Sequence, residues 1–210
     1  MNDPRITEAV ELLKSRDLKK RMTALDLAQN LEGREALALL LKALHDQSWT
    51  LRDHAIPKII AKGPQAIVPI LRHLTSCVWY TRAALAQVLY STGDHRAAVP
   101  LFLVLDDSNK SVAEEAQKAL QAIIHRADPE ILWEQAVGLS GSQREHYLDY
   151  LKKELHNQPQ KLSQIQDQEF LNSDGTEDDP KADAGVILQQ LRKAVKVSLK
   201  QSSDVEYDEF

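Results

Sequence analysis

Two tryptophan–arginine pairs are the residues whose types and spacing could support a function in this sequence of 210 residues. Trp49 and Arg52 are followed 30 residues later by Trp79 and Arg82, and Tyr80 adds a third ring to the second pair. Tryptophan, tyrosine and arginine side chains supply much of the binding energy at protein interfaces. The spacing therefore predicts a partner-binding site that consists of Trp49, Arg52, Asp53, Trp79, Tyr80 and Arg82.

The same residues also have a structural interpretation, which the sequence leaves open. Tryptophan usually buries most of its area, so both rings could instead pack between neighbouring repeats. The arginines, together with the weaker match Arg21, could form a ladder along the repeats beside acidic residues such as Asp46, Asp53 and Asp17. The exposure of the two tryptophan rings separates the two interpretations.

The rest of the sequence contains no assembled catalytic or metal-binding pattern. Its seven histidines form no HExxH motif, and neither a GxSxG turn nor a phosphate-binding glycine loop occurs. We therefore expect no catalytic residue, no metal and no cofactor.

Nothing in the sequence directs the chain to a membrane or to an oxidising compartment. The N-terminus has no basic region followed by an apolar run, and no stretch is long enough for a membrane span. The single cysteine, Cys77, permits no internal disulfide and agrees with a reducing compartment. We expect a cytoplasmic protein.

The elements that must position the predicted site are helices arranged in a repeat. Leu37, Leu40, Leu41 and Leu44 have the spacing of an apolar helix face. A helix with one such stripe must pack against neighbours, as stacked repeats do. We predict an all-α protein whose helical hairpins span residues 4–33, 34–63, 64–94, 95–127 and 129–156.

Several helix ends carry their own signals. Asp3 and Asp128 each precede a proline, which predicts an N-cap followed by the first helical residue. Ser142 and Glu145 have the spacing of a capping box. Left-handed C-terminal caps are predicted at Gly33, Gly63 and Gly93.

The segments "AVPLFLVLDD" from Ala98 and "TLRDHAIPKIIAKG" from Thr50 resemble the HEAT-repeat family, particularly the short bacterial type similar to phycobilisome-lyase HEAT-like repeat proteins. The resemblance implies a right-handed α-α superhelix, a solenoid of about five hairpins with partners on its concave face. It also implies two alternatives. One is a bilin lyase or chaperone-like subunit. The other is an alkylpurine DNA glycosylase using Trp49, Asp53, Trp79 and Arg82.

The charge distribution argues against nucleic acid as the partner. Residues 1–156, the expected repeat domain, carry 20 basic and 20 acidic side chains, whereas the remainder carries 6 and 11. Binding to phosphate backbones needs an excess of positive charge, which a neutral domain lacks. A protein partner, bound by a non-enzymatic scaffold or adaptor, is therefore the leading prediction.

Beyond residue 156 the sequence changes character. Residues 157–185 are polar and predict a largely flexible linker, with a modest helix around Ile165 preceding its most polar part. Residues 186–201 predict an amphipathic helix, and residues 202–210 form an acidic tail. That helix could dock on a partner, on its own repeats or on a second copy through Ile187, Leu191, Val195 and Leu199.

Overall fold

Every element of regular structure in the computed structural model is a helix over residues 3–75 and 77–173, the residues that it describes. The predicted all-α class is therefore confirmed. In chain order the helices are α1 (Pro4–Leu13), α2 (Leu18–Gln29), α3 (Arg34–Ala43), α4 (Trp49–Ala61), η1 (Gly63–Ala66), α5 (Ile67–His73), α6 (Trp79–Thr92), η2 (His95–Ala97), α7 (Ala98–Phe102), α8 (Lys110–Arg126), α9 (Pro129–Val137), α10 (Gly141–Glu154) and α11 (Pro159–Ser173).

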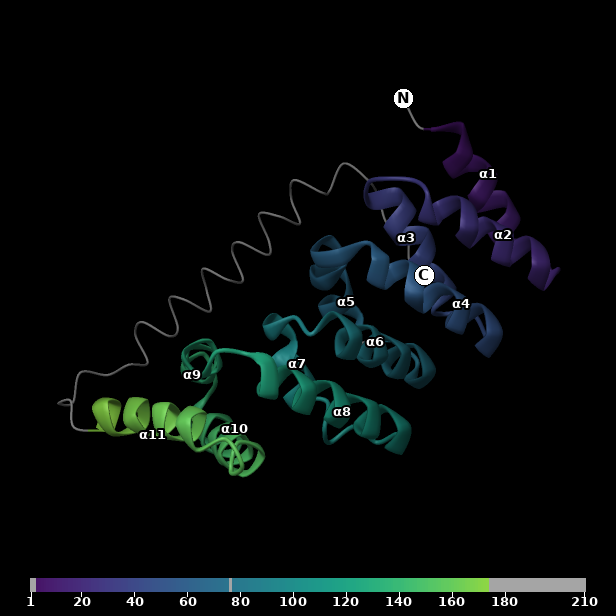
Figure 1. Cartoon of the computed structure of the whole chain (residues 1–210). Coiled ribbons are helices and arrows are strands. Elements are labelled where there is room, and N and C mark those ends of the chain that lie inside the picture. The colour runs from purple at the N-terminus through teal and green to yellow at the C-terminus, as the bar shows by residue number, and fades with distance from the viewer. Residues whose placement is uncertain (1–2, 76, 174–210) are drawn as a thin grey trace. The chain divides into compact units, whose positions relative to one another are not determined.

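The chain divides into two compact units between Ala127 and Asp128. In the first unit α1 packs on α2, α3 on α4, α5 on α6 and α7 on α8. The second helices of these pairs, α2, α4, α6 and α8, lie side by side in this order, each in contact with the next (Figure 1). This row of neighbouring helices carries the predicted binding residues.

The apolar stripes read from the sequence form the core of the first unit. Leu37, Leu40, Leu41 and Leu44 of α3 and the following turn are all buried. On α4, which packs against α3, the buried stripe consists of Leu51, Ala55 and Ile59, each fully buried. Burial of these stripes holds each helix against its neighbours and fixes which side of α4 faces solvent.

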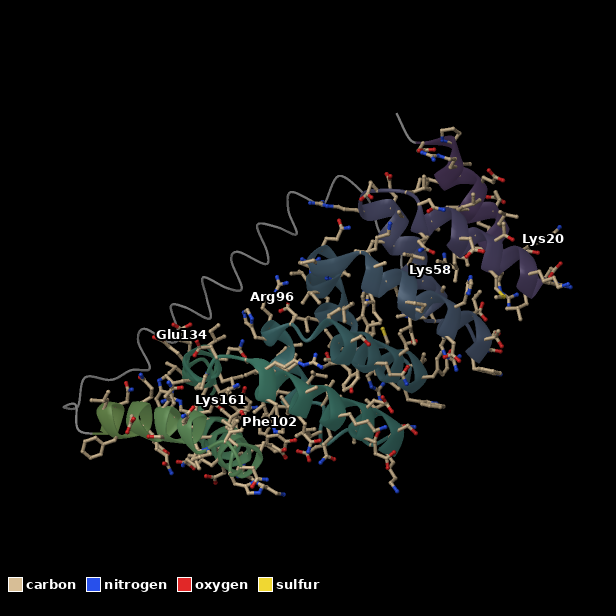
Figure 2. All side chains as sticks on the ribbon, in the orientation of Figure 1. Lys20, Lys58, Arg96, Phe102, Glu134 and Lys161 are labelled. Carbon is tan, nitrogen blue, oxygen red and sulfur yellow. The ribbon has the colours of Figure 1, made fainter. Side chains whose placement is uncertain are left out.

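Two buried lysines also join α4 to α2. The Nζ atom of Lys58 lies 2.8 Å from both the Gln29 side-chain oxygen and a carboxylate oxygen of Asp26. Lys62 donates to the carbonyl oxygens of Gln29 and Leu31 at 2.9 and 2.5 Å. The second lysine thereby satisfies carbonyl groups that are left without partners where α2 ends. The first, Lys58, is labelled on α4 in Figure 2.

The predicted aspartate caps are confirmed, but the predicted capping box is wrong. The Asp3 and Asp128 side chains accept hydrogen bonds from the first turns of α1 and α9. Helix α10 begins at Gly141, so its N-cap is Ser140, whose hydroxyl donates to the Gln143 side chain at 2.9 Å. The same residue spacing occurs two positions earlier than expected, and this earlier frame marks the start of the helix.

Only one of the three glycines is a left-handed cap of the expected kind. Gly93 ends α6 with φ 63° and ψ 21°. Gly63 has φ 64° but begins the η1 turn after the cap of α4 at Lys62. Gly33 has φ 93° and ψ −179°, outside the left-handed helical region, and it precedes α3 as the N-cap residue. All three positions still require the positive φ that glycine tolerates best.

The second unit contains the last three helices of the described chain. α9 packs on α10, and α11 packs against α9 with Ile165 fully buried. Lys152 joins α10 to α11 through Glu169 at 2.8 Å. Thus a helix occupies residues 159–173 of the segment where a linker was predicted, while the predictions for residues 186–201 and 202–210 lie outside the described residues.

Candidate aromatic edge at the helix amino termini

The predicted site residues lie where α2, α4, α6 and α8 begin. Arg21 near the start of α2 reaches Asp46 just before α4, and Arg82 near the start of α6 reaches Asp107 just before α8. Between them, Arg52 of α4 stacks on Tyr80 of α6. These contacts place the amino-terminal ends of α2, α4, α6 and α8 next to one another. We call the strip that they form, with Trp49, Arg52, Trp79 and Tyr80 at its centre, the aromatic edge.

The aromatic edge exposes two tryptophan rings. Trp49, the first residue of α4, is 68% exposed, and Trp79, the first residue of α6, is 48% exposed. The Trp79 ring stands edge-on to Tyr80, with centroids 5.7 Å apart. Val78 beside it is also exposed. The rings therefore form a surface patch on two adjacent helices rather than the packing between them.

Arg21, Arg52 and Arg82 share one pattern of backbone contacts. Each guanidinium donates through Nη1 to carbonyl oxygens of the turn that precedes its own helix. For Arg21 the acceptors are Ser15 and Arg16, at 3.0 and 3.1 Å. For Arg52 they are Asp46 and Gln47, at 2.7 and 3.1 Å. For Arg82 the acceptor is Cys77.

Two of the three arginines also hold a carboxylate from the next repeat. Nε and Nη2 of Arg82 donate to the two carboxylate oxygens of Asp107 at 2.7 and 2.8 Å. Arg21 pairs with Asp46 more loosely, since its Nε atom lies 3.1 Å from the carboxylate without forming a hydrogen bond and its Nη2 atom donates at 3.5 Å. The predicted ladder of arginines thus exists at these two joints, and Asp46 is one of its partners.

The Arg82–Asp107 pair is the more buried of the two, with side chains 16% and 11% exposed. The hydrogen bond from Arg82 holds the pKa of Asp107 below its ordinary value, and the bond to Asp107 raises the pKa of Arg82. Both shifts favour the ionised pair. Asp107 was not identified from the sequence, although its distance of 25 residues from Arg82 repeats the distance from Arg21 to Asp46.

The joint between α4 and α6 is built differently. Arg52 lies 4.5 Å above the Tyr80 ring, and Tyr80 donates its hydroxyl to the His45 carbonyl at 3.3 Å. His45 in turn places Nε2 3.2 Å from the Cys77 sulfur. Thr81, which is fully buried, donates to the Leu44 carbonyl at 2.8 Å. At this joint, therefore, the Tyr80 ring and a cluster of polar side chains take the place of the aspartate that is found at the other two joints.

The structure brings together most, but not all, of the predicted site residues. Arg52 lies over the Tyr80 ring, and Trp79 stands edge-on to the same ring. Trp49 is the first residue of α4, three residues before Arg52. Asp53 is exposed and forms no ion pair with the described residues. Arg82 is turned toward Asp107, and all three of its nitrogen donors are engaged. Asp17, proposed as a ladder residue, caps α2 by accepting from the Lys19 backbone N–H.

A second polar cluster lies between α2 and α4. Asp26 accepts from His54 at 2.8 Å and from Lys58 at 2.8 Å. Burial raises the pKa of Asp26, but the hydrogen bonds from Lys58 and His54 outweigh burial and hold the pKa below its ordinary value. The cluster therefore works as a bridge between two helices.

No group of three or more histidine, cysteine, aspartate or glutamate side chains within residues 3–75 and 77–173 is arranged to hold a metal ion. No helix in these ranges combines the length and apolar character needed to cross a bilayer.

Comparisons with known proteins add no family to these observations. No protein-family model matches the chain, and no curated protein is significantly similar to it.

Proposed function

We propose that this protein is a non-enzymatic interaction module, a HEAT-like α-α superhelix that binds a protein partner through its concave side and aromatic edge. The observation that carries the proposal is the exposure of Trp49 and Trp79 on adjacent helices. Large rings left in water on two neighbouring helices cost hydrophobic free energy that a partner can recover by covering them. They also sit beside Arg52 and Tyr80, the other residue types enriched among interface hot spots.

The row of second helices supports the superhelical part of the proposal. α2, α4, α6 and α8 each contact the next, and the first helices of the pairs form a second layer over them. Such stacking of helical pairs creates the extended binding surface that solenoid proteins use. The amphipathic segment 186–201 is proposed as a second docking element through Ile187, Leu191, Val195 and Leu199.

The two enzymatic alternatives rest on the family resemblance alone. A glycosylase would need Arg82 for its ligand, and Arg82 gives all three nitrogen donors to Asp107 and Cys77. A bilin lyase would need a pigment site, for which the described residues provide no specific observation. We therefore place the function with a protein partner and without a cofactor.

Replacing both Trp49 and Trp79 with alanine tests the proposal. Each hot-spot ring contributes about 2 kcal/mol or more, so the double variant should lose at least about 30-fold in affinity for the partner. Because both rings are exposed, its thermal midpoint should stay within about 2 °C of the parent. Proteins captured from a lysate of the source cells by the immobilised parent and variant would be quantified by mass spectrometry.

Tyr90→Ala is the matched control for this comparison. Tyr90 is 47% exposed, similar to Trp79, but lies near the other end of α6. Partners that Tyr90→Ala retains and the double variant loses belong to the aromatic edge. If the double variant melts early, the rings are structural, and if it keeps every partner, the edge is not the binding site.

A further inference from the structure

The guanidinium of Arg52 lacks the carboxylate that its two counterparts hold. Nε and Nη2 of Arg21 and Arg82 face Asp46 and Asp107, respectively. In Arg52 only Nη1 is engaged, by two backbone carbonyls, and no acidic side chain of the described residues reaches the other two nitrogens. The Arg52 side chain is also partly exposed. Two donors of a charged fork are therefore available at the centre of the aromatic edge.

The sequence explains why this joint has no carboxylate. Asp46 lies three residues before α4, and Asp107 lies three residues before α8. The position three residues before α6 is Ser76, which lies outside the described residues. Neither Ser76 nor Cys77, which lies 25 residues after Arg52, carries a carboxylate, so the chain provides none at the positions that correspond to Asp46 and Asp107.

The start of α6 shows a second, independent shortage of acceptors. α2 and α8 are capped by the side chains of Asp17 and Asn109, which accept from first-turn N–H groups. The N-cap residue of α6 is Val78, which has no acceptor, and Ser48 of α4 makes no side-chain cap bond. The first turns of α4 and α6 therefore lack a side-chain cap among the described residues, and the positive ends of these helices favour an anion beside Arg52.

Tyr80 fixes the direction in which the free donors point. Its ring covers one face of the Arg52 guanidinium, while the carbonyl oxygens of Asp46 and Gln47 accept hydrogen bonds from Nη1. A planar guanidinium restrained in this way loses little freedom when it forms a bidentate contact in its own plane. Asp53 is the nearest acidic residue in sequence, but it is turned about 100° around the helix axis and forms no ion pair with Arg52.

We infer that the α4–α6 joint is a carboxylate-reading position, at which an aspartate or glutamate of the partner binds Nε and Nη2 of Arg52 between the exposed Trp49 and Trp79 rings. The partner segment is accordingly acidic at one position and apolar on either side of it. This inference rests on the proposed function, because it names the chemistry of the partner that the aromatic edge binds.

The test uses the full chain as bait for a phage-displayed library of random dodecapeptides. Selected peptides should carry aspartate or glutamate next to an aromatic or aliphatic residue. Changing that acid to its amide should weaken binding about 10- to 100-fold, the range for a charge-assisted bidentate contact. Affinity would be measured with a fluorescent copy of the strongest peptide.

Arg52→Gln, measured with the acid and amide forms of the peptide, separates binding from folding. The variant should weaken the acidic peptide at least about tenfold, because it removes the guanidinium that the carboxylate binds. It should leave the affinity for the amide form within about twofold, since that form makes no charge-assisted contact with Arg52. A variant that binds the amide form with the parental affinity has kept its fold, so its loss of the acidic peptide cannot be attributed to unfolding.

The possible failures are distinguishable. A library that yields no acidic peptides, an amide analogue that binds equally well, or an Arg52→Gln variant with unchanged affinity for the acidic peptide overturns the carboxylate-reading position. Peptides without an acid that still require Trp49 and Trp79 would leave the proposed function standing. Peptides that bind the double tryptophan variant as tightly as the parent would overturn the proposed function itself.

Discussion

Replacing Asp107 with alanine should lower the free energy of unfolding of the first unit by about 3 kcal/mol, because it leaves the guanidinium of Arg82 largely buried without its counter-charge. The carboxylate is 11% exposed and accepts two hydrogen bonds from Arg82 and one from the Asn109 backbone. Asp46→Ala should cost less, since Asp46 is 24% exposed. Urea unfolding followed by circular dichroism near neutral pH measures both.

The effect of Asp107→Ala should depend on pH in a defined direction. The pKa of Asp107 is lowered in the folded state, first of all by the hydrogen bond from Arg82, from an ordinary value of 3.8. A carboxyl whose folded pKa is depressed stabilises the fold fully above its unfolded pKa and loses this contribution as the pH falls through the folded value. The difference in the free energy of unfolding between parent and variant should therefore be largest near neutrality and decrease progressively below pH 3.8.

Glu114→Ala is the control for charge removal alone. Glu114 pairs with Lys110 at 3.6 Å, and the two side chains are 53% and 90% exposed. An exposed pair of this kind contributes less than about 0.5 kcal/mol. Equal losses for Asp107→Ala and Glu114→Ala would show that the ladder contributes nothing beyond a surface charge.

The helices could be predicted from the sequence because the apolar residues that recur with helical spacing are also the residues that are buried. Each apolar stripe, such as Leu37 to Leu44, can leave water only by packing on a neighbouring helix, so periodicity and burial coincide. Helix starts were predictable where one residue decides them, as at Asp3 and Asp128. At α10 two overlapping frames, from Ser140 and Ser142, have the same spacing, and only the end of the preceding turn selects between them.

The site was only partly predictable, since its geometry depends on residues that are distant in sequence. The arginines and tryptophans were found because they recur in adjacent repeats. Asp46 and Asp107 are 61 residues apart, two repeats, and the repeat between them has no acid at that spacing. A search for adjacent copies therefore misses them. The exposure of Trp49 and Trp79 could not be predicted either, because neighbouring side chains and not the repeat decide whether a ring is covered.

Leu51→Ala should destabilise the first unit by about 3 kcal/mol, whereas Trp49→Ala, two residues earlier, should change stability by less than about 0.5 kcal/mol. Leucine is the smaller side chain, but Leu51 is fully buried and its truncation leaves a cavity in the core. Trp49 is 68% exposed, so its removal exposes little that was covered. Urea unfolding of the two single variants, read by circular dichroism, provides the comparison.

The opposite order of stabilities would contradict the placement of both residues. If Trp49→Ala were the more damaging variant, the ring would be part of the core and could not be available to a partner. Binding should show the reverse dependence: Trp49→Ala weakens partner capture while the fold is kept, and Leu51→Ala weakens it only in proportion to the unfolded fraction. Positions 49 and 51 point to different sides of α4, and therefore a single helix turn contains both a residue that stabilises the fold and one that serves recognition.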